Sequence, residues 1–129
     1  MENKINKDFI QIFRLSEDNT KPGRVLYSAK IGEVYMTRIM IDPGVIIGNH
    51  YRKNTRVMYH LCSGQALVVF EDVATKQKQE FMLRQKREVV HVPENVALAV
   101  KNVGNDVAEL VAFSNNPLRS EDTVEYKVM

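Results

Sequence analysis

His50 and Arg52 are the two side chains whose types and spacing could do chemistry together. They are two residues apart, so in an extended segment both point to the same face of the strand. A guanidinium beside an imidazole lowers the imidazole pKa and favours the neutral ring, which can accept a proton. The same guanidinium can bind a phosphate or another anionic oxygen. The pair therefore indicates proton transfer or anion binding, against the plainer alternative of a histidine hydrogen-bonded at a strand end.

Three further cations are candidates for contact with a ligand. Lys53 and Arg56 follow Arg52 closely, and three cations in five residues usually form a solvated turn. At the mouth of a barrel, however, the same cluster would attract a diphosphate. Arg38 stands in an otherwise apolar run, so it either pairs with a carboxylate on a neighbouring strand or lines a cavity.

Tyr59 has the same strand parity as Val57 and Leu61, which predicts that its ring points into the barrel. His60 has the opposite parity and is expected to point away from the ligand side. A buried Tyr59 is either a core aromatic whose hydroxyl finds one partner, or a general acid or a ring stacked on a ligand.

The elements that must position these residues are strands. Short runs rich in Val, Ile, Phe, Tyr and Thr end at Gly, Pro, Asn or Asp, and no segment shows a helical stripe. The chain therefore predicts an all-β sandwich or barrel, with residues 115–122 as an exposed connection before the last strand. The expected strands cover residues 9–15, 24–30, 34–41, 57–62, 65–73, 79–83, 88–92, 97–102, 107–113 and 123–128.

Length, charge and cysteine content limit the class of protein. A chain of 129 residues predicts one domain over residues 1–129. The formal charge of +2 is too small to suggest a nucleic-acid surface, although residues 1–56 carry ten basic and six acidic side chains. The lone Cys62 and the absence of a signal-like start favour a cytoplasmic setting. No apolar stretch approaches the roughly 20 residues of a membrane span, so no membrane partner is expected.

Two motifs resemble those of the cupin superfamily. Gly44 to Arg52, followed by Gly64 fourteen residues after His50, resembles the first motif, and Val92-Pro93-Glu94-Asn95 with Asn102 resembles the second. The resemblance covers a core of about residues 34–113. It implies a single-domain cupin, a double-stranded β-helix or jelly-roll barrel. Within the superfamily, Gly48-Asn49-His50-Tyr51 looks most like the sugar-nucleotide branch of epimerases, 3,4-ketoisomerases and capsular polysaccharide enzymes.

The metal-ligand positions of the family are mostly lost. A metal-binding cupin resembling this chain would carry two further His and one Glu where Arg52, Val57 and Leu98 stand. One imidazole cannot hold a first-row metal in a defined site, so neither a metal nor another cofactor is expected. This ranks a metal-dependent oxygenase last.

The resemblance to the metal-free branch implies proton transfer beside the ketone of a dTDP- or UDP-linked keto-deoxyhexose. It implies that His50 is the base, Arg52 its electrostatic partner and Tyr59 a possible acid. Arg38, Asn49, Lys53 and Arg56 are the expected substrate-binding residues. Ile47 and Val57 stand where polar groups are expected, which favours the alternative of a non-catalytic cupin that binds a sugar or another small ligand. A homodimer is expected, with residues 9–30 as the contact.

Overall fold

The structure, a computed structural model, describes residues 4–7, 9–84 and 86–129. These residues form strands joined by turns, without a helix, as the sequence predicts. The strands are β1 (Lys4–Lys7), β2 (Ile10–Phe13), β3 (Ser16–Asp18), β4 (Arg24–Ile31), β5 (Val34–Ile41), β6 (Ile46–Arg52), β7 (Val57–Ser63), β8 (Ala66–Asp72), β9 (Lys78–Leu83), β10 (Val89–Val92), β11 (Val96–Asn102), β12 (Ala108–Ser114) and β13 (Thr123–Glu125).

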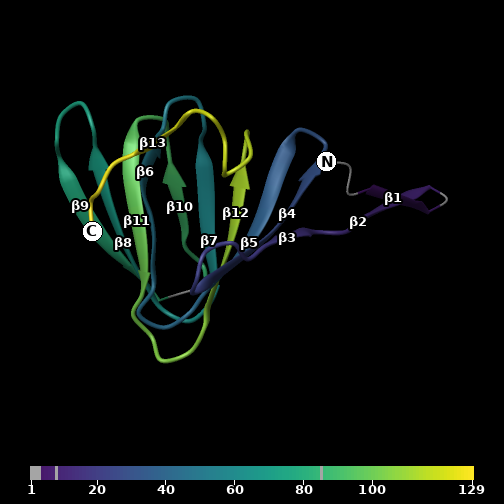
Figure 1. The fold of residues 1–129 in the computed structure, drawn as a ribbon, viewed down its shortest axis with the longest axis horizontal. Coiled ribbons are helices and arrows are strands. Elements are labelled where there is room, and N and C mark those ends of the chain that lie inside the picture. Colours follow the sequence, from purple (N-terminus) through teal and green to yellow (C-terminus); the bar gives the residue numbers. More distant parts are fainter. Residues whose placement is uncertain (1–3, 8, 85) are drawn as a thin grey trace.

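Two antiparallel sheets face each other and form the barrel (Figure 1). One has the order β10-β7-β12-β5-β4-β3 and the other the order β13-β6-β11-β8-β9. Their inner faces meet in one apolar core, which includes Ile39, Leu61 and Leu110 from the first sheet and Val68 and Leu98 from the second. The predicted all-β barrel is confirmed.

Strict alternation along β7 shows how the sequence divides the two faces of a sheet. Val57, Tyr59 and Leu61 are buried on the inner face, whereas Met58 and His60 are on the outer face. His60 Nδ1 lies 3.1 Å from the carbonyl oxygen of Glu88 there.

Strand β6 carries His50 and was not among the expected strands. Gly48 and Asn49, which favour turns, adopt positive φ values of 95° and 59° inside it. The register of β6 against β11 shifts at this point, between Leu98 and Ala99. A Cβ atom on Gly48 would lie 2.6 Å from the Leu98 carbonyl oxygen, so a side chain there would force the two strands apart.

The expected last strand ends early, at Glu125 instead of residue 128. Beyond Glu125, the side chain of Asn49 takes the place of a neighbouring strand as hydrogen-bond partner. Its Oδ1 accepts hydrogen bonds from the backbone N–H groups of Val128 and Met129, at 2.9 and 3.0 Å. Asn49 Nδ2 also donates to the Met129 carbonyl, at 3.3 Å. The side chain of Asn49 therefore holds the C-terminal segment against the barrel.

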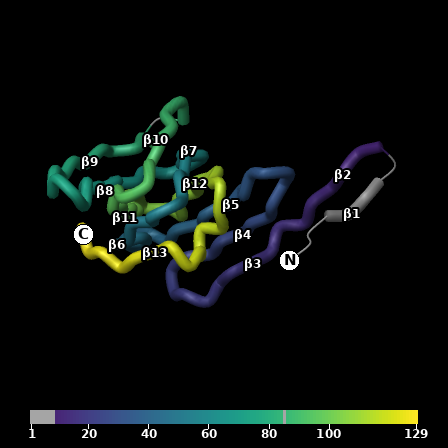
Figure 2. Tube along the Cα trace, turned by 90° about the horizontal axis from the view of Figure 1, so that it is seen from above, coloured from purple at the N-terminus to yellow at the C-terminus, as the bar shows by residue number. Residues whose placement is uncertain are grey.

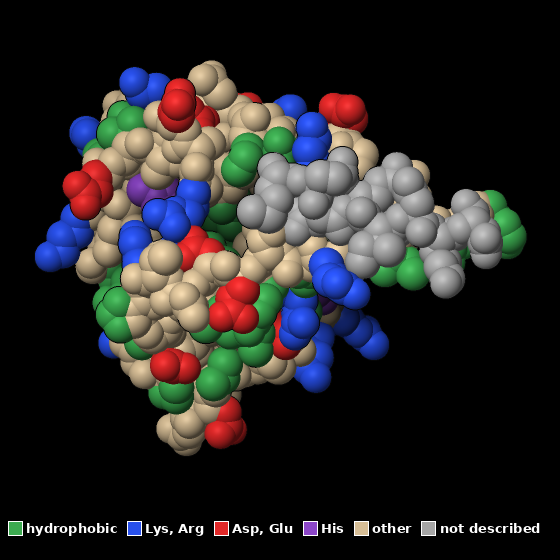
Figure 3. All heavy atoms as spheres, turned by 45° about the vertical axis from the view of Figure 1, so that its right-hand side comes forward, with side chains coloured by type: hydrophobic (Ala, Val, Ile, Leu, Met, Phe, Trp, Pro, Cys, Tyr) green, Lys and Arg blue, Asp and Glu red, His purple; other side chains and the backbone are tan. Residues whose placement is uncertain are grey.

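The β1–β2 hairpin projects from the barrel (Figure 1), and Figure 2 shows β2 leading away from it. Figure 3 shows hydrophobic side chains at the tip of this projection. Phe9 is 97% exposed, and Ile10 and Ile12 are about half exposed. The homodimer stays a prediction, for which these side chains are candidate contacts.

Candidate functional site

A cavity of about 360 Å³ opens into the barrel between the two sheets. Strands β4, β5 and β7 contribute to one wall, and β6, β11 and β13 to the other. Residues 118–120 close a third side. Its lining residues are Lys21, Arg24, Leu26, Ile39, Ile47, Gly48, His50, Arg52, Tyr59, Leu98, Val100, Leu118, Arg119, Ser120 and Thr123.

His50 lines this cavity with a neutral ring. The pKa of His50 is lowered to about 4, first by burial and then by the charges of Arg52 and Lys21, while a hydrogen bond to the Gly48 backbone opposes the shift. Because Nε2 has no hydrogen-bond partner, the Gly48 bond is made by Nδ1. A bond that raises the pKa is one in which Nδ1–H donates to a carbonyl oxygen. Nε2 is then the nitrogen with the free lone pair.

Three buried polar side-chain atoms in the described part of the chain have no hydrogen-bond partner: Arg24 Nη1, His50 Nε2 and Thr123 Oγ1. Buried polar groups are nearly always paired, because an unpaired one costs about 1–3 kcal/mol. All three residues line the same cavity. The hollow therefore presents a guanidinium donor, a hydroxyl and an imidazole acceptor that a polar ligand could pair.

Arg52 is held rigidly beside His50. Its side chain is buried, and Nε and Nη2 donate to the Leu118 carbonyl oxygen at 3.2 and 2.8 Å. This bond ties β6 to the segment that closes the cavity. A guanidinium fixed in this way keeps its positive charge in one place on the cavity wall.

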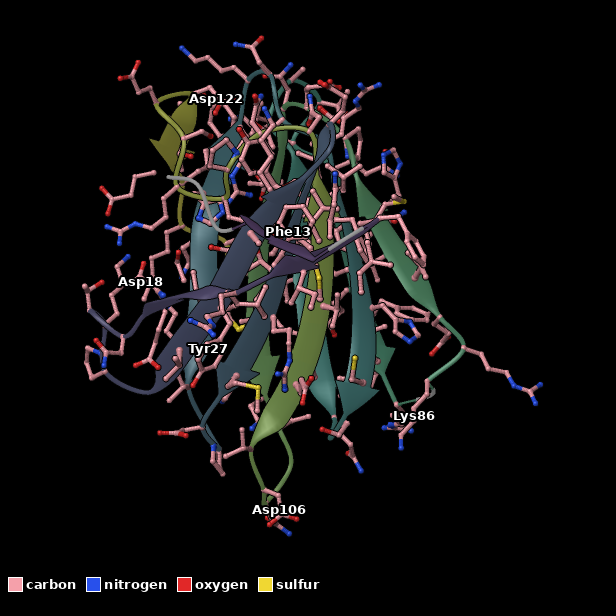
Figure 4. The ribbon with its side chains drawn as sticks, turned by 90° about the vertical axis from the view of Figure 1, so that its right-hand side faces the viewer. Phe13, Asp18, Tyr27, Lys86, Asp106 and Asp122 are labelled. Carbon is pink, nitrogen blue, oxygen red and sulfur yellow. The ribbon has the colours of Figure 1, made fainter. Side chains whose placement is uncertain are left out.

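Asp122 anchors the segment that closes the cavity (Figure 4). Its Oδ2 accepts from the backbone N–H of Asn54 at 2.7 Å and from Thr55 Oγ1 at 2.8 Å, and Ser120 Oγ donates to Oδ1. Burial raises the pKa of Asp122, but these hydrogen bonds lower it more, so the net direction is downward. The carboxylate stays charged at neutral pH and holds residues 120–123 against the β6–β7 turn.

Tyr59 also lines the cavity and is buried, so the structure brings together His50, Arg52 and Tyr59. The four expected substrate-binding residues lie outside it. Arg38 is on the outer face of its sheet, where Nε lies 3.1 Å from Glu109 Oε2. Asn49 binds the C-terminal segment, as described above.

Lys53 and Arg56 are exposed in the turn between β6 and β7. Arg56 Nε lies 3.4 Å from Glu94 Oε1; the side chain of Arg56 is exposed and that of Glu94 is partly exposed. This is the solvated turn that the sequence allowed as the alternative to a diphosphate site.

Three cavity-lining cations were missed in the sequence: Lys21, Arg24 and Arg119. Lys21 and Arg119 lie in segments read as connections, and no local pattern marks them. Arg24 could have been found, because it has the strand parity of Leu26. In the register of β4 with β5, Arg24 pairs with the core residue Ile41 and Leu26 with Ile39.

The site does not fit a metal ion. The residues at the other cupin ligand positions are Arg52, Val57 and Leu98, and the positive charges of Arg52 and Lys21 near His50 would repel a divalent ion. Among residues 4–7, 9–84 and 86–129, no three His, Cys, Asp or Glu side chains are grouped as metal ligands. In the same residues no helix has the length and apolar character of a membrane span.

Comparisons with known proteins agree with this architecture. A model of the polysaccharide biosynthesis C-terminal domain family matches residues 24–126. The capsular polysaccharide assembling protein CapF from Staphylococcus aureus has a similar structure, with a TM-score of 0.79 at 18% identity, over 91% of this chain and 35% of CapF. The chain thus spans about a third of CapF. No curated protein matches the sequence significantly.

Oxalate decarboxylase from Bacillus subtilis is also similar, with a TM-score of 0.73 at 17% identity, over 85% of this chain and 30% of that protein. Its description names Mn(II) centres. CapF and oxalate decarboxylase have the cupin fold, so the predicted cupin fold of this chain is confirmed.

Proposed function

The chain belongs to the polysaccharide biosynthesis C-terminal domain family, and on that premise we propose that it is a metal-free cupin that isomerises or epimerises a nucleotide-linked keto-deoxyhexose. The observation that carries the proposal is the set of unpartnered buried atoms, His50 Nε2 among them, in one cationic cavity. Together they present a neutral base and fixed positive charge to whatever enters the hollow.

In the proposed reaction, His50 Nε2 takes the proton from the carbon next to the ketone. The electron pair of that C–H bond forms the carbon–carbon double bond of an enolate, and the negative charge moves to the ketone oxygen. Arg52, fixed by the Leu118 carbonyl, stabilises this charge without having to move. Return of a proton from Tyr59 to the opposite face of the same carbon gives the epimer. For the isomer, the hydroxyl proton of that carbon passes to the enolate oxygen, and His50 returns its proton to the former ketone carbon.

A non-catalytic cupin that binds a sugar or another small ligand is the second candidate. Apolar side chains favour it, because Ile47, Leu98 and Val100 line the cavity beside His50. A hollow with much apolar surface and few polar groups is the usual form of a binding pocket.

Incubation with dTDP- and UDP-4-keto-6-deoxyhexoses in deuterated water tests the proposal. We expect deuterium on carbon next to the ketone, detected by NMR and mass spectrometry, and none with the His50→Gln variant. His91→Gln is the matched control, because His91 is exposed and lies outside the cavity.

Absence of carbon-bound deuterium across the whole panel would contradict the enzyme proposal. If the same sugars nevertheless raise the melting temperature of the protein, the binding function is the correct one.

A further inference from the structure

Three cations from two distant parts of the chain meet at one side of the cavity. Lys21 and Arg24 come from the start of β4 and the turn before it, and Arg119 comes from the segment before β13. Among the residues that the structure describes, no Asp or Glu lines the cavity. Cations that surround a hollow without a facing carboxylate create a positive potential that favours an anionic ligand.

Arg24 is the buried member of this group. Its side chain is only 9% exposed, and its Nη1 has no hydrogen-bond partner. A buried guanidinium donor without a partner is a polar group that a ligand oxygen would satisfy. Phosphate suits it well, since its oxygens can accept from two N–H groups of one guanidinium.

Asp18, at the end of β3 and labelled in Figure 4, forms ion pairs with both arginines. Its Oδ2 lies 2.6 Å from Arg119 Nη1 and 3.9 Å from Arg24 Nη1. Asp18 thus satisfies Arg119 with a hydrogen bond, while it neutralises Arg24 without hydrogen-bonding it. Asp18 does not itself line the cavity.

Thr20 holds the Asp18 carboxylate in place. The Thr20 hydroxyl and backbone N–H donate to Asp18 Oδ1 at 2.7 and 3.1 Å. These two bonds, followed by the bond from Arg119, keep the pKa of Asp18 far below its usual range. The group is therefore a permanent negative charge.

We propose that Arg24, Arg119 and Lys21 form an anion subsite for a phosphate or diphosphate group, and that Asp18 is its internal counter-ion, which competes with the ligand for the two arginines. The inference rests on the proposed function in taking the ligand to be phosphorylated. It goes further by naming which residues hold the phosphate and which one opposes it. The turn cations Lys53 and Arg56 have no part in it.

Two effects of Asp18 on an incoming anion have opposite signs. Its ion pair orients Arg119, but the side chain of Arg119 is 60% exposed, and exposed ion pairs contribute little. Its charge repels the ligand, and the repulsion is screened less in a partly buried site than in water. Repulsion is the larger effect, so removal of the charge should strengthen binding.

Calorimetric titration with inorganic pyrophosphate, and separately with UDP and uridine, tests the inference without any need for turnover. Asp18→Asn keeps an oxygen for Thr20 and removes the charge, and we expect it to bind pyrophosphate about five-fold more tightly. Asp106→Asn, on the loop between β11 and β12 (Figure 4), removes the same charge elsewhere and should leave the affinity within about two-fold.

Arg24→Gln should weaken the binding of pyrophosphate and UDP at least about ten-fold, whereas Arg56→Gln should not. Melting temperatures and circular dichroism establish that each variant is folded. If Arg24→Gln fails to fold, Arg24→Lys keeps the charge but loses the planar fork, and an intermediate loss is expected.

Unchanged or weaker pyrophosphate binding in Asp18→Asn would overturn the counter-ion role. Equal affinities of wild type and Arg24→Gln, or uridine binding as tightly as UDP, would overturn the anion subsite. Deuterium exchange is measured separately, so the two proposals can fail independently. If only the isomerase proposal is wrong, pyrophosphate binds as expected but no deuterium appears on carbon.

Discussion

Two groups of positive charges, similar in composition, meet different environments in this molecule. The turn group, Lys53 and Arg56, is close together in the sequence and lies exposed, and Arg56 has the partly exposed Glu94 as a partner. The cavity group, Lys21, Arg24 and Arg119, is dispersed in the sequence but converges on one hollow. Charge density along a chain does not make an anion site. Lys21 and Arg119 are exposed as well, so the second group is distinguished by the convergence of separate segments on one cavity, where the buried Arg24 has an unpaired donor.

The largest effect is expected where a fixed cation faces the reacting atoms. Arg52→Gln should lower the rate of deuterium exchange about 100-fold, because it removes a preorganised donor for the enolate oxygen. Arg56→Gln, four residues along the chain, should change the rate less than about two-fold. If both variants lose the same fraction of the exchange rate, measured by NMR on the same substrate, a cation in the cavity has no greater effect than one in the turn.

Acid should weaken the folded state through His50. Its pKa is about 4 when folded against an ordinary 6.5, so the unfolded chain takes up the proton first as the pH falls. The stability contributed by His50 is therefore complete above about pH 6.5 and is lost as the pH falls towards 4, by at most about 3 kcal/mol.

Urea unfolding gives the free energy of unfolding of wild type and His50→Gln at each pH between 7.5 and 4. The loss is the difference between the two proteins in how steeply this free energy falls with pH. His91→Gln should keep the slope of the wild type. If the free energy of unfolding of His50→Gln falls with pH as steeply as that of the wild type, His50 does not titrate as described.

The comparison between Arg52 and Arg56 extends to stability. Loss of the Arg52 side chain leaves the Leu118 carbonyl without its two donors, which should cost about 1–2 kcal/mol in urea unfolding at pH 7. Arg56→Gln should stay within about 0.5 kcal/mol of the wild-type stability, because the side chain of Arg56 is exposed. If the Arg52 variant is as stable as the wild type, the hydrogen bonds between Arg52 and Leu118 do not contribute to the stability of the fold.

The smallest effect concerns the exposed lysines. Lys21 lines the cavity near His50, so Lys21→Gln should weaken the binding of UDP about three-fold at low salt. Lys53→Gln should not change it measurably. If Lys53→Gln weakens the binding of UDP more than Lys21→Gln does, the anion binds at the β6–β7 turn instead of in the cavity.

The barrel could be predicted from the sequence because its strands alternate cleanly, as Val57, Tyr59 and Leu61 do along β7. Strand β6 escaped prediction because Gly48 and Asn49 read as turn residues, and only the pairing with β11 makes their positive φ values part of a strand. His50 was predicted from its place in the cupin-like motif, Arg52 from its spacing to His50, and Tyr59 from its strand parity. Arg119 could not be predicted as a cavity residue. Its position depends on the contacts of Asp122 with the β6–β7 turn and on its own ion pair with Asp18, and no local sequence pattern reveals either.

The most direct test of the account is NMR of the His50 ring, labelled with nitrogen-15, in a pH titration with and without UDP. We predict a neutral ring with its proton on Nδ1, a pKa of about 4 in the free protein, and a shift of the Nε2 signal when UDP enters the cavity. A pKa near 6.5 together with no response to UDP would contradict the claim that His50 is a neutral base in the ligand site.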